Sequence, residues 1–263
     1  VLLEAGGHDR HPWVHIPVGY LYAMGNPRLD WCYKTAPVAG VNGRTLNYPR
    51  GRALGGCSSI NGMIYMRGQA RDYDLWRQMG NTGWGWEDVL PYFKRSEDYH
   101  RGADALHGAG GEMRVENQRL SWEILDGVRE AAAEMGIPPS DDFNTGDNEG
   151  AGYFEVTQRG GLRWNARRAF LDPAKTRKNL RIVTNAEAEQ IVIIEGRVRA
   201  LRYRQNGIVK DIQIRGELVL AAGAIGTPKL LELSGIGQAE RLQGLGIPVI
   251  QDSPEIGENL ADH

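Results

Sequence analysis

The chain has 263 residues, of which 41% are hydrophobic and 24% are charged, a composition typical of a folded globular protein with one large or two medium domains. The formal net charge is −2, and the 31 lysines and arginines are spread along the sequence, which argues against a nucleic-acid partner. The two cysteines, Cys32 and Cys57, are too few for a disulfide framework and lack metal-binding spacing, so a reducing compartment is expected. No apolar run approaches the roughly 18 residues that a membrane span needs.

The first predicted element is the end of a buried strand, VLLEAGG at Val1–Gly7. In a doubly wound sheet, an acid at the carboxyl end of the second strand binds the ribose hydroxyls of a dinucleotide, and Glu4 has that position. A solvated glutamate at a strand end is the alternative. The sequence contains no complete G-x-G-x-x-G. Because that fingerprint precedes the ribose-binding acid by about 20 residues, it would lie upstream of Val1, and we expect the chain to be an internal fragment.

The region 8–49 is rich in proline, glycine and aromatic residues, so long ordered loops with short strands are expected. Three histidines without a nearby carboxylate pattern are interpreted as loop residues rather than metal ligands: His8, His11 and His15. Four aromatic residues are interpreted as ordinary packing, with a pocket for a choline-like cation as the alternative: Tyr20, Tyr22, Trp31 and Tyr33.

The stretch GRALGGCSSINGMIYMRG, Gly51–Gly68, combines glycines with small side chains. Small residues allow a flat ring or an anion to approach the backbone, whose N–H groups then point at the ligand. Arg52 adds positive charge beside such a ligand. A loop that merely turns tightly is the alternative.

Two amphipathic helices are predicted next, over Trp86–Phe93 and over Trp122–Met135, the second ended by Gly136. Polar, glycine-rich connections follow each of them, at 98–111 and 140–152. A short strand is expected over 152–158. It is followed in RGGLRWNARRAFLDPA by a glycine turn and a short helix.

From residue 180 to 220, alternating β-branched runs are broken at Glu195-Gly196 and at Asn206-Gly207, which predicts an antiparallel meander. A strand at 218–220 is then expected to lead through a glycine turn into a helix with Thr227 as N-cap and Pro228 at the first position, ending before 234–237. The free N–H groups at that start predict an anion site suited to a diphosphate.

Three passages resemble the signatures of the glucose–methanol–choline (GMC) oxidoreductases, in the family's order. GRALGGCSSIN at 51–61 is similar to the first signature, GAIGTPKLLELSGIG at 223–237 to the second, and GENLADH at 257–263 to a G-x-N-L-x-D-H segment. LLEAGG at 2–7 also fits the bacterial choline- and alcohol-dehydrogenase branch. Some members carry, at the position of Ile60, a histidine bonded to the flavin, so the resemblance implies non-covalent FAD.

The resemblance implies an α/β (α+β) protein with a Rossmann-like FAD-binding domain over 1–113 and 162–263, and part of an antiparallel-sheet substrate-binding domain over 114–161. It also implies the FAD-dependent oxidation of a primary alcohol, such as choline or an aliphatic or aromatic alcohol, to the aldehyde. The implied cofactor-binding residues are Glu4, Arg52, Gly55, Gly56, Ser58, Asn61, Gly62, Met63, Ile64, Ala188, Ala222 and Gly223. The family's catalytic pair, a histidine with a second histidine or an asparagine, is expected beyond His263, which is not itself that base.

The expected partners are a small-molecule alcohol, an electron acceptor (oxygen, a quinone or another carrier) and the missing C-terminal part of the same protein. A cytoplasmic location is expected, either free or at the surface of the inner membrane. A non-catalytic dinucleotide-binding module is the alternative function. A disulfide-reductase-type flavoprotein requires a close redox pair, and Cys32 with Cys57 is not one.

Overall fold

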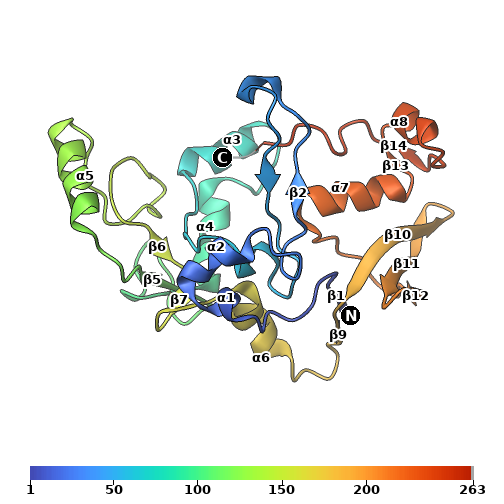
Figure 1. The fold of residues 1–263 in the computed structure, drawn as a ribbon, viewed down its shortest axis with the longest axis horizontal. Coiled ribbons are helices and arrows are strands. Elements are labelled where there is room, and N and C mark those ends of the chain that lie inside the picture. Colours follow the sequence, from blue (N-terminus) through green and yellow to red (C-terminus); the bar gives the residue numbers. More distant parts are fainter. Residues whose placement is uncertain (262–263) are drawn as a thin grey trace. The chain divides into compact units, whose positions relative to one another are not determined.

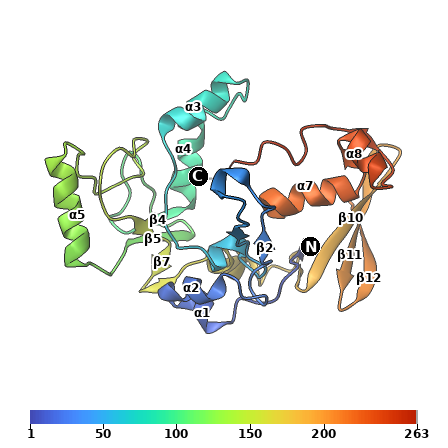
Figure 2. The same ribbon diagram turned by 45° about the horizontal axis from the view of Figure 1, so that its top comes forward.

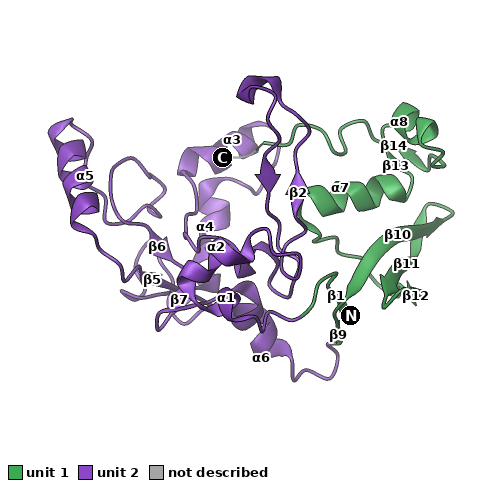
Figure 3. Ribbon diagram, viewed as in Figure 1, with its two compact units in different colours: residues 1–7, 181–263 green, residues 8–180 purple. Residues whose placement is uncertain are grey.

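A computed structural model describes residues 1–261, so the prediction for His263 lies outside the described residues. The chain divides into two compact units (Figure 3): unit 1 comprises Val1–Gly7 and Arg181–His263, and unit 2 comprises His8–Leu180. Both units contain helices together with parallel and antiparallel strands, which confirms the α/β class. Within residues 1–261 no helix is both long and apolar enough to cross a bilayer.

Unit 1 contains short parallel pairs and one antiparallel sheet (Figure 1). The parallel pairs are β1 (Leu2–Leu3) with β9 (Ile182–Val183), and β13 (Ile236–Gly237) with β14 (Gln251–Asp252). The sheet has the order β10 (Ala186–Ile194), β11 (Arg197–Gln205) and β12 (Ile208–Gln213). The helices are α7 (Gly223–Leu233) and α8 (Ala239–Gly244).

The meander confirms the two predicted turns. Glu195 and Gly196 have φ of 51° and 71°, and Asn206 and Gly207 have φ of 51° and 79°. Positive φ at both central residues defines the type I′ turn, whose twist matches that of the strands it joins. Helix α7 packs against β10 (Figure 2), and Leu230 of α7 forms a buried cluster with Ile191 and Leu201.

Two predictions for unit 1 are wrong in detail. Residues 218–220 alternate in burial as a strand does, with Val219 exposed, but no ladder hydrogen bond is recorded for them among the described residues, so no strand forms. Helix α7 begins at Gly223, not at Pro228. Thr227 is not its N-cap, because it lies inside the helix, where its Oγ1 accepts the N–H of Ala222 at 3.1 Å.

Unit 2 contains the remaining elements (Figure 1). Its helices are α1 (Pro12–His15), η1 (Pro17–Gly19), α2 (Tyr20–Ala23), η2 (Ala39–Val41), η3 (Gly56–Ser59), α3 (Ala70–Gln78), α4 (Trp86–Ser96), α5 (Glu123–Glu134), the π-helix η4 (Arg167–Leu171) and α6 (Asp172–Ala174). Its strands are β2 (Tyr33–Lys34), β3 (Asn47–Tyr48), β4 (Glu97–Tyr99), β5 (Met113–Asn117), β6 (Glu155–Val156), β7 (Gln158–Arg159) and β8 (Leu162–Arg163).

Helices α4 and α5 confirm the two predicted amphipathic helices. The region 8–49 differs from expectation, because it contains short helices as well as loops and the short pair β2–β3. Those helices have three or four residues, too few for a periodic signal. They are stabilised by tertiary packing, in which Val14 of α1 and Ala23 of α2 join Leu29, Ala53 and Ile60 in a buried cluster.

Candidate cofactor site

The glycine-rich loop of unit 2, residues Gly51–Ile64, contains two glycines that the protein itself requires. A Cβ on Gly51 would lie 2.2 Å from the carbonyl oxygen of Gly56, because the loop folds back on itself. Gly55 has φ of 94°, and a Cβ there would meet Ser59 Oγ at 2.5 Å. Each of these positions excludes a side chain whether or not a ligand binds.

Gly56 and Gly62 are different, because a Cβ at either position would have no described atom within 4 Å. Gly56 has a positive φ of 54°, whereas Gly62 is not among the positive-φ residues. Neither packing nor backbone conformation therefore requires glycine at position 62. An exposed backbone without side chains is what a flat ring approaching the loop needs, so this part of the loop fits FAD.

The side chains of the loop mainly support its own conformation. Ser58 Oγ donates to the carbonyl of Gly55 at 2.5 Å and accepts the N–H of Ala166 at 2.9 Å. Ile60 and Met63 are 3% and 4% exposed. Arg52 lies over the ring of Trp31, with 4.7 Å between its Cζ and the ring centroid. The backbone of Met63 is engaged within the protein, since its N–H donates to Asn61 Oδ1 and its carbonyl accepts the N–H of Thr157, while Ile64 exposes its side chain.

Arg163 of β8 organises the loop, and sequence reasoning missed it. Its guanidinium is buried and donates to the Ser58 carbonyl at 3.0 Å and to Asn61 Oδ1 at 2.8 Å. Burial lowers the pKa of Arg163 to about 10. Asn165 reaches the same loop, since its Nδ2 donates to Ser59 Oγ at 2.8 Å. The residue pattern of β8 could not reveal this role, because the apolar residue Leu162 is 44% exposed and the charged residue Arg163 is buried, the reverse of the usual arrangement.

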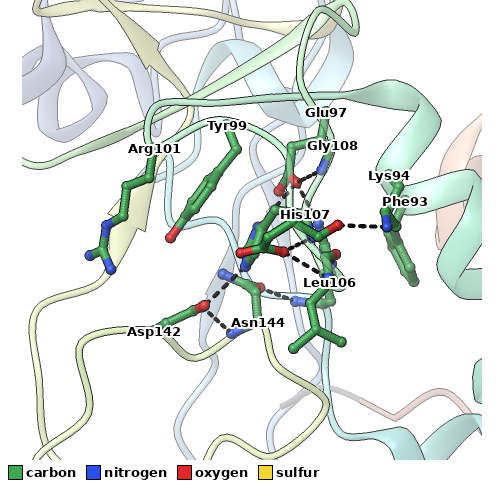
Figure 4. A network of polar contacts seen from close by, with 12 residues as sticks. Phe93, Lys94, Glu97, Tyr99, Arg101, Leu106, His107, Gly108, Asp142 and Asn144 are labelled. Atoms are coloured by element: carbon green, nitrogen blue, oxygen red, sulfur yellow. Dashed lines mark hydrogen bonds and ion pairs between the residues drawn. The ribbon is translucent and has the colours of Figure 1, made fainter.

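A second buried network lies outside the glycine-rich loop, around Glu97 and His107 (Figure 4). Arg67 pairs with Glu97 at 2.7 Å, and both side chains are fully buried. His107 Nδ1 lies 3.1 Å from the same carboxylate, and its Nε2 lies 2.9 Å from Asp142. The ring of Tyr99 stacks on His107 with 3.7 Å between centroids.

The pKa values in this network follow from its ion pairs. Burial alone would lower the pKa of His107, but its hydrogen bonds and charge contacts with Asp142 and Glu97 raise it to about 9. Burial alone would raise the pKa of Glu97, but contacts from His107, the Gly108 N–H and Arg67 bring it below its usual range. The network therefore contains ionised partners at neutral pH, which is how a protein stabilises buried charge.

The remaining predicted cofactor residues lie in unit 1. Glu4 follows β1, its N–H donates to the Val183 carbonyl, and its Oε1 accepts the N–H of Gly6 at 2.7 Å. Ala188 lies in β10 next to a register shift. Ala222 and Gly223 form the start of α7, where Gly223 has φ of 82° and a Cβ would have no described atom within 4 Å. The N–H groups of that first turn have no acceptor within the helix, a feature that suits a diphosphate.

Of the other candidate residues, Tyr22, Trp31 and Tyr33 take part in aromatic stacking and His11 makes a local backbone contact. Trp13 stacks on Tyr22, and Trp31 stacks on Tyr33. His11 Nδ1 accepts the N–H of Trp13, which makes it the N-cap of α1. Among residues 1–261 no group of three or more His, Cys, Asp or Glu side chains could hold a metal ion. Cys32 and Cys57 are free thiols.

Comparisons with known proteins match most or all of the chain. A family model described as GMC oxidoreductase matches residues 27–263. The chain is 39% identical to an oxygen-dependent choline dehydrogenase of Rhizobium johnstonii and 38% identical to an alcohol dehydrogenase [acceptor] of Pseudomonas putida; in each case the match covers 100% of this chain and 48% of the relative. The chain therefore spans about half the length of the curated relatives it matches.

Two solved structures are similar as well. A pyridoxine 4-oxidase from Mesorbium loti has a TM-score of 0.92 at 32% identity, over 97% of this chain and 50% of that one. An FAD-dependent oxidoreductase from Chaetomium thermophilum has a TM-score of 0.87 at 30% identity, over 96% of this chain and 46% of that one.

Proposed function

Because the chain belongs to the GMC oxidoreductase family, we propose that it forms the cofactor-binding part of an enzyme that oxidises a primary alcohol to the aldehyde. Membership confirms the resemblance seen in the two signatures, the Rossmann-like FAD-binding fold and FAD as the cofactor. The relatives are named for choline, for alcohols and for pyridoxine, so the shared chemistry is the oxidation of an alcohol carbon. The activity is a proposal because the chain spans 48% of those dehydrogenases.

The observation that carries the proposal is the open glycine surface at Gly56 and Gly62, within the matched family region. When bound, FAD supplies an acceptor for the hydride that leaves the alcohol carbon. The backbone of the glycine-rich loop would hold the flavin, and small residues there keep side chains out of its plane. Non-covalent attachment stays a prediction, supported by the aliphatic side chain of Ile60, which cannot bond to a flavin.

The residues of unit 1 would hold the ADP half. Glu4 would accept hydrogen bonds from ribose hydroxyls, as an acid after a parallel strand does. Ala222 and Gly223 would place the start of α7 at the diphosphate, which would accept N–H groups from Gly223 onward, since the N–H of Ala222 itself is bonded to Thr227 Oγ1. Ala188 would contact the adenine through its backbone.

The functional domains are proposed as 1–113 and 162–263 for FAD binding and 114–161 for part of the substrate domain. The base that takes the hydroxyl proton would come from the rest of the full-length protein, beyond His263, and the electron acceptor would be oxygen, a quinone or another carrier. A cytoplasmic location, free or at the inner membrane surface, stays a prediction.

The test uses the purified full-length protein. We expect a flavin absorbance band that an alcohol bleaches under anaerobic conditions, with choline, aliphatic and aromatic alcohols compared. A colourless protein that cannot be reconstituted with FAD would contradict the proposal. Bound flavin that no alcohol reduces would instead favour the non-catalytic dinucleotide-binding module.

A further inference from the structure

Arg163 is a buried cation with an unusual set of partners. The residue is 1% exposed, and each of its four hydrogen bonds goes to a carbonyl or amide oxygen rather than to a carboxylate. Burying a guanidinium without an anion is unfavourable, so a residue kept there must do something that an apolar side chain cannot. Its contacts indicate what that is.

Three of the four hydrogen bonds reach the glycine-rich loop. Nη1 donates to the carbonyl of Ser58 and to Oδ1 of Asn61, at 3.0 and 2.8 Å, and Nη2 donates to the carbonyl of Asn61 at 2.7 Å. The fourth, from Nε to the Val14 carbonyl at 2.8 Å, connects the guanidinium to the end of α1. A planar fork spans these separated acceptors at once, whereas the single nitrogen of lysine cannot.

These contacts fix the peptide between Asn61 and Gly62. Residues 1–261 contain no cis peptide bonds, and in a trans peptide the C=O and the following N–H point in opposite directions. Because the Asn61 carbonyl points inward to Arg163, the Gly62 N–H points away from it, toward the side where Gly62 is exposed and a Cβ would meet nothing within 4 Å.

The next residue is held through the same side chain. Asn61 Oδ1, which accepts from Arg163, also accepts the N–H of Met63 at 3.1 Å. Met63 has φ of 65°, a conformation that a non-glycine residue adopts only when its surroundings stabilise it. The N–H groups of Gly62 and Met63 are thus both oriented through contacts that Arg163 makes with Asn61.

We propose that Arg163 is the positioning residue of the flavin site, and that it holds the Asn61–Gly62 peptide so that the Gly62 N–H is presented to the flavin. This inference rests on the proposed function, since it assigns the exposed side of Gly62 to FAD. Arg163 is 1% exposed and leaves almost no surface for a cofactor, so it acts through the loop.

The experiment compares two buried arginines in the full-length protein. FAD is removed and titrated back into wild type, Arg163→Lys and Arg67→Lys, and fluorescence reports the dissociation constant. Arg67 is the matched control, because it is also buried, at 4% exposed, but pairs with Glu97 and makes its hydrogen bonds outside residues 51–62. We expect Arg163→Lys to weaken FAD binding at least about tenfold and to change the visible circular dichroism of the bound flavin, since hydrogen bonds from a charged donor are lost. Arg67→Lys should lower the unfolding midpoint without either change.

Chemical rescue separates positioning from general stability. In Arg163→Ala, low millimolar guanidinium should restore FAD binding and slow proteolysis of the loop in the apoprotein, whereas methylammonium, which has the same charge but no fork, should not. Normal FAD affinity in Arg163→Lys, or equal losses in both lysine variants, would overturn the inference. Should Arg163→Ala not fold, the two lysine variants decide the question. Wild-type protein that binds no FAD would reject the proposed function instead, before any variant is compared.

Discussion

Two kinds of glycine lie within the glycine-rich loop, and they predict opposite effects of the same substitution. Gly51 faces the backbone of Gly56 at a distance that no Cβ tolerates, whereas Gly62 faces open space. Glycine at position 51 is needed for folding, and glycine at position 62 is explained by a ligand. Alanine substitutions at the two positions therefore distinguish an effect on stability from an effect on ligand binding.

We expect Gly62→Ala to leave the stability of the apoprotein within about 0.5 kcal/mol of wild type, because its Cβ meets nothing and its φ is not positive. FAD affinity should fall at least about tenfold, since the methyl group occupies the ligand's side. Gly51→Ala should cost about 3 kcal/mol through backbone overlap. Urea unfolding of apoprotein and FAD titration measure the two effects. Unchanged FAD affinity in Gly62→Ala would contradict the assignment of that surface.

His107 predicts a loss of stability at alkaline pH. Its pKa is 6.5 in its ordinary state and about 9 in the fold, so its ion pairs contribute fully below pH 6.5 and are lost as the pH rises through about 9. Glu97 and Asp142 have lowered pKa values, so their contribution is present above their ordinary values of 4.5 and 3.8 and is lost as the pH falls toward their values in the fold.

The measurement is urea unfolding of wild type and His107→Gln between pH 6 and 10. The difference between the two pKa values of His107 corresponds to at most about 3 kcal/mol of unfolding free energy. The variant should be less stable near pH 7, where Glu97 and Asp142 lose their cation, and the difference should shrink toward pH 10. Subtracting the variant's curve of unfolding free energy against pH from that of wild type cancels the contribution of other groups that titrate in this range. A constant difference across the range would show that His107 does not titrate as expected.

At the scale of elements, the hairpins β10–β11 and β11–β12 offer a matched pair of turns. Both have positive φ at two central residues, but the first turn has Glu195 where the second has Asn206. Asparagine adopts the left-handed region more readily than glutamate. Glu195→Asn should therefore stabilise the protein by about 0.5 kcal/mol, and Asn206→Glu should destabilise it by a similar amount. Thermal unfolding of both variants measures this, and shifts of the same sign in both would contradict the turn assignment.

The same elements show what local sequence could predict. The meander is predicted by its turn residues, and helices α4 and α5 are predicted by helical periodicity. Both signals come from residues that are close in sequence. Where distant contacts decide, the prediction was wrong or absent. Residues 218–220 alternate in burial but gain no strand partner within residues 1–261. The short helices α1 and α2 depend on tertiary packing. Thr227 accepts the N–H of Ala222 from inside α7 and is not the N-cap of that helix.

For the candidate site, the motifs located the loop but not what holds it. The glycine-rich signature could be recognised because its residues are adjacent. Arg163 lies about a hundred residues from Ser58 and Asn61 in the chain, and it points inward from a strand whose leucine points outward. No periodicity rule predicts a buried arginine with carbonyl partners, because its burial is favourable only when the fold brings hydrogen-bond acceptors to the guanidinium.

At the scale of the whole molecule, the positions of the cofactor-binding and catalytic residues predict whether the 263-residue chain alone can oxidise an alcohol. Every residue assigned to the cofactor lies between Glu4 and Gly223, whereas the resemblance places the catalytic pair beyond His263, and the curated relatives are about twice as long as this chain. The 263-residue chain should therefore show no alcohol oxidation with oxygen or with an artificial acceptor, because the resemblance places the base that takes the hydroxyl proton beyond His263. The full-length protein, assayed in parallel with the same alcohols, is the positive control. Turnover by the 263-residue chain itself would mean that the base lies among its own residues, and the placement of the catalytic pair would then be wrong.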